Sequence, residues 1–395
     1  GCILRRFPAV MGGKTMKRIL YVIGSVLLLL LKVVVGCLCL ALTCSVLLSF
    51  LLNGGNARKT TQNSDTNYAL TDRYNMFITN TLSDTLDGVL SIPKTYWLND
   101  DDLVAPKPNP DGYGTTQDPA SLQWLLDKAA PLLDGQDTLF TTQTPVHQGS
   151  TIHYYYDETI LVITWKQVID NAMYTISEVK IADPSQFRRF VADGVYGSSS
   201  KYVPSEMATS VNAVLATNGD FYSFRDVGII VYDGKLMRAE GYSMDSCLIA
   251  GNGDLIFAHM GQYGSREAMQ KLIDENDVRF SVAFGPVLVE DGKLCWIKDP
   301  YPVGEGNQYY QRMALCQRDT LHYLMVTVCD EPPYGPSHTL DVLAENLLDM
   351  GCKMAYNLDG GQSATTVMNN KTINYVWQRK VSDILYFATA IPNGG

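Results

Sequence analysis

Several catalytic signatures are missing from this 395-residue chain. It contains no GxSxG, no Walker A and no GxGxxG pattern, which argues against a serine hydrolase, a P-loop NTPase and a Rossmann enzyme. The five histidines show neither HxH nor HExxH spacing, and the nine cysteines form no CxxC pair. A histidine metal site, a zinc knuckle and a thioredoxin-like redox site are therefore not indicated.

Basic residues are scarce outside the first 60 positions. Residues 61–395 hold 23 Lys and Arg against 41 Asp and Glu, whereas residues 1–60 hold eight basic residues and no acidic one. Because contacts with phosphate backbones need clustered Lys and Arg, we expect no nucleic-acid partner. With 23 Tyr, 12 Phe and 5 Trp, the chain also lacks the composition of a disordered protein.

A long apolar run occupies residues 19–52, with Lys32 as its only charge. Val33–Leu52 alone gives twenty apolar or small residues, about the number that crosses ~30 Å of hydrocarbon. We expect one transmembrane signal-anchor here; two short spans or a cleaved signal peptide are the alternatives. The positive-inside rule then predicts a single-pass protein of the cell membrane, with residues 1–18 as a cytoplasmic basic tail and the acidic part extracytoplasmic.

The remainder divides by composition. Residues 53–67 are polar and rich in Gly, Asn and Thr, which is typical of a linker. Residues 68–149 have weak periodicity, and we interpret them as a membrane-proximal region with one helix that starts after Asp118. Residues 150–395 are dense in strand-like runs, and we expect them to form the functional domain.

Turn dipeptides and helical spacing predict the elements of residues 150–395. Hairpins are expected at Asp233-Gly234, Asn252-Gly253 and Asp291-Gly292. Strands are expected at Thr151–Tyr156, Thr159–Ile169, Tyr174–Ile181, His322–Cys329 and Asp383–Ile391, and helices at Ser265–Asn276, at Thr339–Met350 and, with Phe187, Phe190 and Val191 on one side, after Asp183-Pro184. The predicted class is α+β, a mixed, largely antiparallel sheet core with flanking helices, preceded by the N-terminal transmembrane helix.

Polar residues stand where predicted strands meet loops. These are Asn218-Gly219-Asp220, Arg312, Asp330, and Asn357 with Asp359-Gly360-Gly361-Gln362-Ser363. Paired glycines after an aspartate let a backbone approach a ligand and turn N–H groups towards anionic oxygens. Carboxylates and an arginine at strand ends suit acid/base work on a phosphate-bearing sugar. Taken singly, Asn-Gly-Asp and Asp-Gly-Gly are also common as plain turns.

The order and spacing of these segments resemble the phosphodiester glycosidase family, which includes hydrolases of N-acetylglucosamine-1-phosphodiesters and bacterial exopolysaccharide-biosynthesis relatives. The resemblance covers roughly residues 175–391. It rests on NAVLATNGDFYSFRDVGIIVYDGK (212–235), FGPVLVEDGK (284–293), GCKMAYNLDGGQSAT (351–365) and RKVSDILYF (379–387). The chain departs from the family at Glu331-Pro332, where Gly-Arg is usual, and at Gln362, where a third glycine is usual.

The resemblance implies a hydrolase that cleaves a sugar-1-phosphodiester bond in cell-surface or exopolysaccharide glycans. Its implied carboxylates are Asp359 and Asp330, then Asp220, and its implied phosphate contacts are Arg312, then Arg379. The expected substrate-binding residues are Asn218, Gly219 and Asn357, with the amides of Gly360, Gly361 and Ser363 facing the phosphate. No cofactor is required, although a divalent cation, Ca²⁺ or Mg²⁺, is compatible with oxygen ligands. Two alternatives remain: a cell-wall glycopolymer phosphotransferase, and a non-catalytic glycan-binding or assembly protein.

Overall fold

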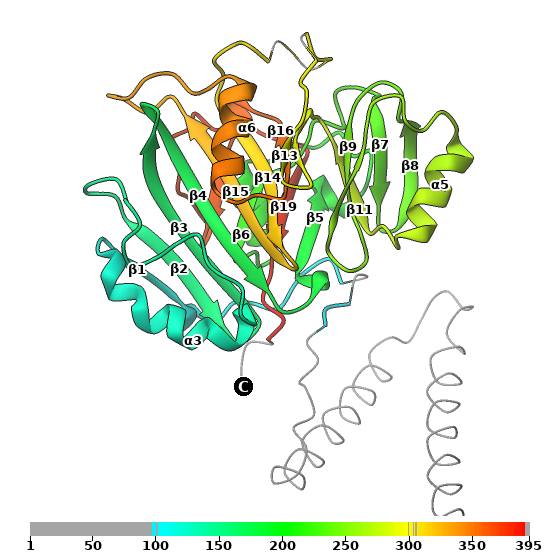
Figure 1. Ribbon diagram of the computed structural model, residues 1–395. Coiled ribbons are helices and arrows are strands. Elements are labelled where there is room, and N and C mark those ends of the chain that lie inside the picture. Colours follow the sequence, from blue (N-terminus) through cyan, green and yellow to red (C-terminus); the bar gives the residue numbers. More distant parts are fainter. Residues whose placement is uncertain (1–96, 100–101, 299, 303, 305, 392–395) are drawn as a thin grey trace, which may run out of the picture. The chain divides into compact units, whose positions relative to one another are not determined.

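The computed structural model describes residues 97–99, 102–298, 300–302, 304 and 306–391 (Figure 1). The expected signal-anchor of residues 19–52, the linker and the start of the membrane-proximal region lie outside the described residues. Within the described ranges, no helix combines the length and the apolar character needed to cross a membrane.

A nine-stranded sheet forms the first layer of the fold (Figure 1). Strands β3 and β4 are joined by Asp170-Asn171, whose φ values of 48° and 64° suit a tight hairpin turn. Each strand pairing in the described part of the chain is antiparallel, so the sheet is not mixed as expected. In spatial order the strands are β1 Tyr113–Thr116, β2 Ile152–Asp157, β3 Ile160–Ile169, β4 Ala172–Ile181, β15 His322–Cys329, β14 Arg312–Asp319, β16 Met354–Leu358, β12 Val287–Glu290 and β13 Lys293–Leu294.

Smaller sheets pack against one face of this layer. A continuous apolar core joins Val162 and Met325 of the large sheet to Phe187, Leu385 and Cys247 of the smaller ones, as expected for sheets packed face to face. The predicted hairpins at residues 233–234, 252–253 and 291–292 are confirmed. The smaller sheets are β18 Lys371–Thr372, β17 Thr366–Met368, β6 Leu215–Asn218, β19 Asp383–Phe387 and β5 Phe187–Val191; β10 Leu255–Ala258, β9 Ser246–Ile249 and β11 Phe280–Ala283; and β7 Gly228–Tyr232 with β8 Lys235–Glu240.

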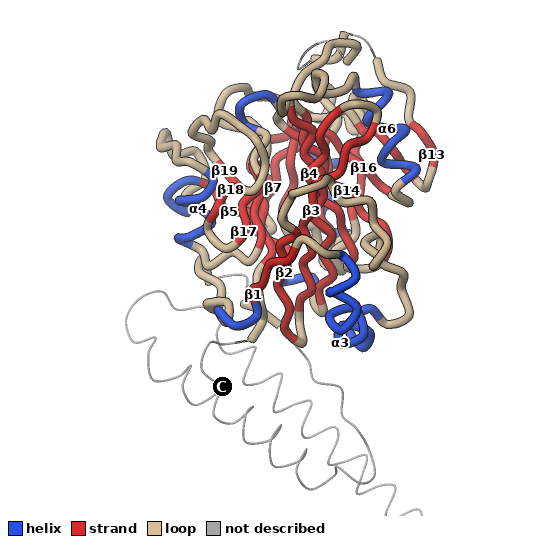
Figure 2. Tube along the Cα trace, turned by 90° about the vertical axis from the view of Figure 1, so that its left-hand side faces the viewer, coloured by secondary structure: helices blue, strands red, loops and turns tan. Residues whose placement is uncertain are grey.

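Helices lie at the periphery of the strands, as the turned view shows (Figure 2). They are α3 Gln123–Leu133, α4 Pro204–Ser210, α5 Arg266–Glu275 and α6 Leu340–Asp349. Helices α3 and α6 bury leucines against the outer face of the large sheet. The predicted helix over 339–350 is confirmed, with Thr339 as its N-cap. Two elements fall within the expected membrane-proximal region: strand β1, which is an edge strand of the large sheet, and helix α3, which packs onto that sheet.

The helix expected after Asp183-Pro184 is wrong. Asp183 caps only a single 3₁₀ turn, Pro184–Gln186, through a capping box. The chain then enters β5, which pairs with β19. Alternation along a strand turns Phe187, Arg189 and Val191 to one face, so sheet pairing overrides the local helical spacing. This arrangement sends Arg189 into the interior, where it matters for the site described below.

Glu178 of β4 fixes the segment that follows α3. One carboxylate oxygen accepts hydrogen bonds from the Leu139 amide at 2.6 Å, from Arg318 at 3.1 Å and from His322 at 2.8 Å. The other accepts the Phe140 amide at 2.8 Å. The side chain is 2% exposed, so these donors replace water around a buried charge.

We therefore expect Glu178→Gln to destabilise the protein by about 2–3 kcal/mol, because an amide removes the charge and turns N–H groups towards donors. Urea unfolding of the purified protein measures the change in the free energy of unfolding. Glu275→Gln is the control, since the Glu275 side chain is 61% exposed and its pair with Lys271 is a surface pair worth less than about 1 kcal/mol. Equal effects of the two substitutions would contradict this role of Glu178.

Candidate functional site

Three strand ends bring the predicted residues together. Strand β14 pairs antiparallel with β16, with Met313 opposite Leu358, so Arg312 at the start of β14 lies beside Asp359 just after β16. Asn218, the last residue of β6, donates its side-chain amide to the Asp359 carbonyl at 2.8 Å. This hydrogen bond connects the five-stranded sheet, which contains β6, to the nine-stranded sheet, where the loop that follows β16 begins.

A cleft of about 200 Å³ opens at this junction. Five residues expected from sequence line it, namely Arg312, Asn357, Asp359, Gly360 and Gly361. The other lining residues were not predicted as site residues; they are Phe284, Tyr301, Gly304, Tyr310, Gln311, Leu340 and Leu358. Apolar and aromatic walls with a few converging polar groups are typical of small-ligand sites.

Asp359 is the carboxylate of this cleft. Its side chain is 14% exposed, and its Oδ2 accepts a hydrogen bond from Arg379 Nη2 at 2.8 Å. Burial raises the pKa of Asp359 above its ordinary value, while Arg379 opposes the rise. A partly desolvated carboxylate held by one arginine suits a nucleophile or a general base.

Arg312 is the buried cation of the cleft. Its guanidinium donates to the backbone carbonyls of His338 at 3.1 Å and Gln308 at 2.6 Å, and lies 5.3 Å from the centre of the Tyr310 ring. Burial lowers the pKa of Arg312 to about 10, so the group stays positive at neutral pH. Because its hydrogen bonds go to neutral carbonyls, its charge can act on an anion in the cleft.

The loop after Asp359 is held by backbone contacts. A Cβ at Gly360 would lie 2.3 Å from the Gln311 carbonyl oxygen, and Gly361 has φ +57°, so both positions favour glycine. The Gly361 amide donates to Gln311 at 2.8 Å and the Ser363 amide donates to Gly360 at 3.1 Å. These two N–H groups therefore do not face a phosphate as expected.

Two buried side-chain oxygens of cleft-lining residues have no hydrogen-bond donor among the described residues. Asn357 gives its side-chain N–H to the Gly285 carbonyl at 2.7 Å, which leaves its Oδ1 without a hydrogen-bond partner in the described part of the chain. The Oε1 atom of Gln311 is in the same condition. Because an unpaired buried acceptor is unfavourable, both oxygens are suited to a hydroxyl group of a bound ligand.

Asp220 lies in a buried ion pair outside the cleft lining. Its Oδ1 accepts from Arg189 Nη2 at 2.9 Å and from the Tyr222 amide at 2.8 Å, and its Oδ2 accepts from the Ala283 amide at 2.8 Å. Arg189 also pairs with Asp383 Oδ2 at 2.8 Å, and the three side chains are at most 1% exposed. With all these contacts, Asp220 holds the loop after β6 in place.

Gly219 leaves room for the Asp383 carboxylate in this buried ion-pair cluster. A Cβ at Gly219 would lie 2.1 Å from Asp383 Oδ2, so any side chain would displace the carboxylate. Asp383 and Arg189 were not predicted as site residues. The available signals were the position of Asp383 in the segment 379–387 and the alternation of Phe187–Val191. Burial, and then the neighbouring Asp220, raise the pKa of Asp383 to about 8, against the opposing effect of Arg189.

This pKa predicts a pH-dependent stability. A carboxyl whose folded pKa is raised stabilises the fold fully below its unfolded pKa, near 3.8, and loses that contribution as pH rises through about 8. The free energy of unfolding of Asp383→Asn should therefore fall less steeply than that of wild type between pH 4 and pH 8. The two slopes should differ by at most about 1.4 kcal/mol per pH unit. Urea titrations across this range measure the change, with Asp349→Asn as the control, because Asp349 is an exposed residue of α6. Parallel curves for Asp383→Asn and wild type would contradict the assignment.

Asp330 lies apart from the cleft lining. It is exposed, and its Oδ1 accepts from the Ser337 amide at 2.7 Å, which closes the loop after β15. Glu331, at the departure from the family pattern, pairs with Lys166 at 2.9 Å. The structure thus gives Asp330 a loop contact, while Asp359 faces the cleft.

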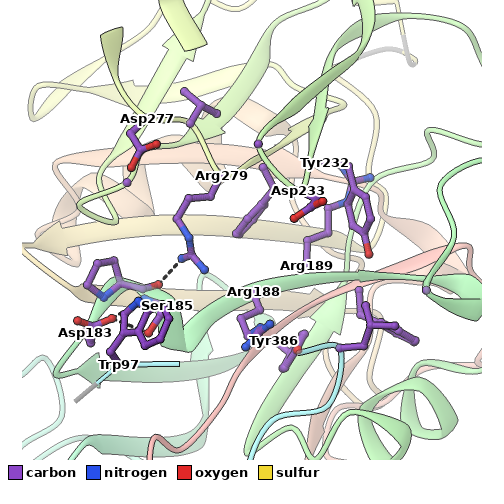
Figure 3. A pocket seen from close by; sticks show the side chains of 18 residues that line it. Trp97, Asp183, Ser185, Arg188, Arg189, Tyr232, Asp233, Asp277, Arg279 and Tyr386 are labelled. Carbon is purple, nitrogen blue, oxygen red and sulfur yellow. Dashed lines mark hydrogen bonds between the residues drawn. The ribbon is translucent and has the colours of Figure 1, made fainter. Parts of the chain in front are cut away.

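A larger cavity of about 510 Å³ lies beside β5 (Figure 3). It shares no lining residue with the cleft. Its arginines already hold the backbone: Arg279 donates to the Pro184 carbonyl at 2.5 Å, and Arg188 donates to the Asp102 carbonyl at 2.6 Å. Arg189 is among the lining residues, and its guanidinium pairs with Asp220 and Asp383. Across the described ranges, no group of three or more His, Cys, Asp or Glu is arranged to hold a metal ion.

Comparisons with known proteins agree with the motifs. The sequence model of a family described as phosphodiester glycosidase matches residues 211–388. A prophage-derived uncharacterized protein of Bacillus subtilis (strain 168) is 25% identical over 255 residues, which are 61% of this chain and 37% of that relative. The chain therefore spans well under half the length of that relative.

Solved structures with a similar course include the catalytic domain of zebrafish N-acetylglucosamine-1-phosphodiester alpha-N-acetylglucosaminidase, auto-inhibited by its pro-peptide. That match has a TM-score of 0.48 and 18% identity, and covers 66% of this chain and 92% of that one. A hypothetical protein from Synechocystis has a TM-score of 0.42 and 12% identity, and the match covers 60% of this chain and 63% of that one.

Proposed function

Residues 211–388 make this chain a member of the phosphodiester glycosidase family, and from this premise we propose that it hydrolyses the bond between the anomeric carbon of a sugar and a phosphodiester. The observation that carries the proposal is one cleft in which Asp359 is held by Arg379 and shares the lining with Arg312. A carboxylate and cations in a partly dry cleft meet the needs of this reaction.

The chemistry follows from the leaving group. A phosphate monoester departs from the anomeric carbon as a stable anion, so the reaction needs less general-acid help than cleavage of an ordinary glycoside. Arg312 would stabilise the charge that develops on the phosphate. Asp359 would attack the anomeric carbon or activate the water that attacks it. Asn357 Oδ1 and Gln311 Oε1 would accept hydrogen bonds from sugar hydroxyls.

Purified protein incubated with an N-acetylglucosamine-1-phosphodiester should release free sugar. Arg312→Ala should lower kcat/KM by about 100-fold, as expected for removal of a group that stabilises transition-state charge. Arg266→Ala is the matched control, because its guanidinium also donates to a backbone carbonyl, that of Leu236, but does not line the cleft. Polymer transfer with strict metal dependence would instead identify a phosphotransferase, and binding without turnover would identify a glycan-binding protein.

We also propose that residues 19–52 anchor the chain in the cell membrane, with the described residues on the outer side. The apolar run and the charge difference across it support this orientation. Protease added to intact cells should then remove the part of the chain that follows the anchor. Protection of that part until the cells are lysed would contradict the orientation.

A further inference from the structure

An exposed aromatic ring carries two cations beside the cleft. Phe224, in the loop after β6, is 56% exposed. The Lys201 Nζ lies 3.7 Å from the centre of its ring, and Arg379 Cζ lies 5.9 Å from the same centre. Since Arg379 also binds Asp359 at 2.8 Å, this ring and both cations belong to the surroundings of the cleft carboxylate.

Within this cluster, Arg379 pairs with the cleft carboxylate Asp359, whereas Lys201 forms no ion pair among the described residues. The Lys201 ammonium group lies instead over the face of the Phe224 ring. Arg379 is 44% exposed at its side chain. Cation–π contacts of this kind hold the side chains in place while their remaining N–H groups stay open to an anion.

Two cationic positions thus lie around Asp359. Arg312 is buried in the cleft lining, and the pair Lys201 and Arg379 lies outside it over Phe224. A phosphodiester carries one negative charge, which Arg312 alone can match. A second, exposed position has a purpose if the substrate carries a second anion at a distance from the reacting one.

We propose that Lys201, Phe224 and Arg379 form a second subsite, which binds the neighbouring phosphodiester of a polymeric sugar phosphate while Asp359 acts on the terminal one. This inference rests on the proposed function and specifies its substrate class. Residues 61–395 carry a large excess of acidic groups, so the overall field repels a polyanion. The local pair of cations offsets this repulsion at the point where the substrate polymer leaves the cleft, and its effect should weaken as the salt concentration is raised.

The test compares two substrates on the full-length protein: a sugar 1-phosphodiester with one phosphate, and an oligomer of the same repeat with three phosphates. Wild type should prefer the oligomer. Lys201→Gln should reduce the preference, as the ratio of kcat/KM values, about five- to tenfold at low salt, and Lys201→Arg should restore it. Lys128→Gln is the matched control. Lys128 is on helix α3, outside the cluster, and its Nζ also lies over an aromatic ring, 5.2 Å from the centre of Tyr156.

Each result bears on the subsite separately from the reaction. An unchanged preference in Lys201→Gln overturns the subsite even if both substrates are cleaved. If wild type cleaves neither substrate, the proposed function fails, and calorimetric binding of the oligomer still tests the subsite through the same variants. Equal inhibition by a polyuronate of the same length would show that any polyanion fits and would overturn the assignment to phosphate.

Discussion

Asp359→Asn should lower kcat/KM for a sugar 1-phosphodiester by about 1000-fold. The amide has nearly the shape of the carboxylate, but it can neither attack the anomeric carbon nor take a proton from water. Its oxygen can still accept the Arg379 hydrogen bond, so the loop should keep its conformation. Initial rates of sugar release measure the loss, and thermal unfolding shows whether the variant is folded.

Asp330→Asn is the informative comparison. The sequence ranks Asp330 beside Asp359, whereas the structure places it in an exposed loop with a contact to the Ser337 amide. We therefore expect less than a tenfold loss of kcat/KM for Asp330→Asn. A loss as large as that of Asp359→Asn would show that the loop after β15 closes over the substrate and would contradict our reading of the site.

Arg189→Met should have the largest effect on stability, about 3–5 kcal/mol, because it leaves Asp220 and Asp383 buried without their cation. Methionine keeps much of the apolar stem of arginine, so the loss reports on charge more than on volume. As the two carboxylates hold the loop with Asn218 and Gly219, activity should fall together with stability. Urea unfolding at pH 7 measures the change in the free energy of unfolding.

Lys271→Met provides the control for this substitution. Its ion pair with Glu275 spans 3.6 Å and both side chains are more than half exposed, so the change should stay within about 0.5 kcal/mol. Above about pH 8 the penalty of Arg189→Met should grow, because wild-type Asp383 is ionised there and pairs with Arg189, whereas at pH 7 it is largely neutral. A penalty below about 1 kcal/mol at pH 7 would contradict the role of the buried cluster.

Local sequence signals accounted for much of the strand pattern. Asp-Gly and Asn-Gly turns located three hairpins because only residues that accept positive φ fit such turns, as Asp233 and Gly234 do here. The failure at β5 has the opposite cause. Its partner β19 lies almost two hundred residues away in sequence, and nothing in the order Phe-Arg-Arg-Phe-Val announces that pairing.

The sequence predicted those site residues that stand at the ends of strands. Arg312 and Asp359 lie side by side because β14 and β16 are antiparallel, so the start of β14 lies next to the end of β16. Asp220 and Asp330 also follow strands, but their surroundings differ: one is enclosed by Arg189 and the other faces solvent. Such surroundings depend on tertiary packing, which is why the resemblance could rank Asp330 with Asp359, and Asp220 after them, without separating the three by environment.

The central claim is that the protein breaks a glycosyl C–O bond. Hydrolysis of a sugar 1-phosphodiester in ¹⁸O-labelled water, followed by mass spectrometry of both products, tests it most directly. We predict ¹⁸O at the anomeric position of the released sugar and none in the phosphate monoester. Label in the phosphate would mean cleavage of a P–O bond and would contradict the account.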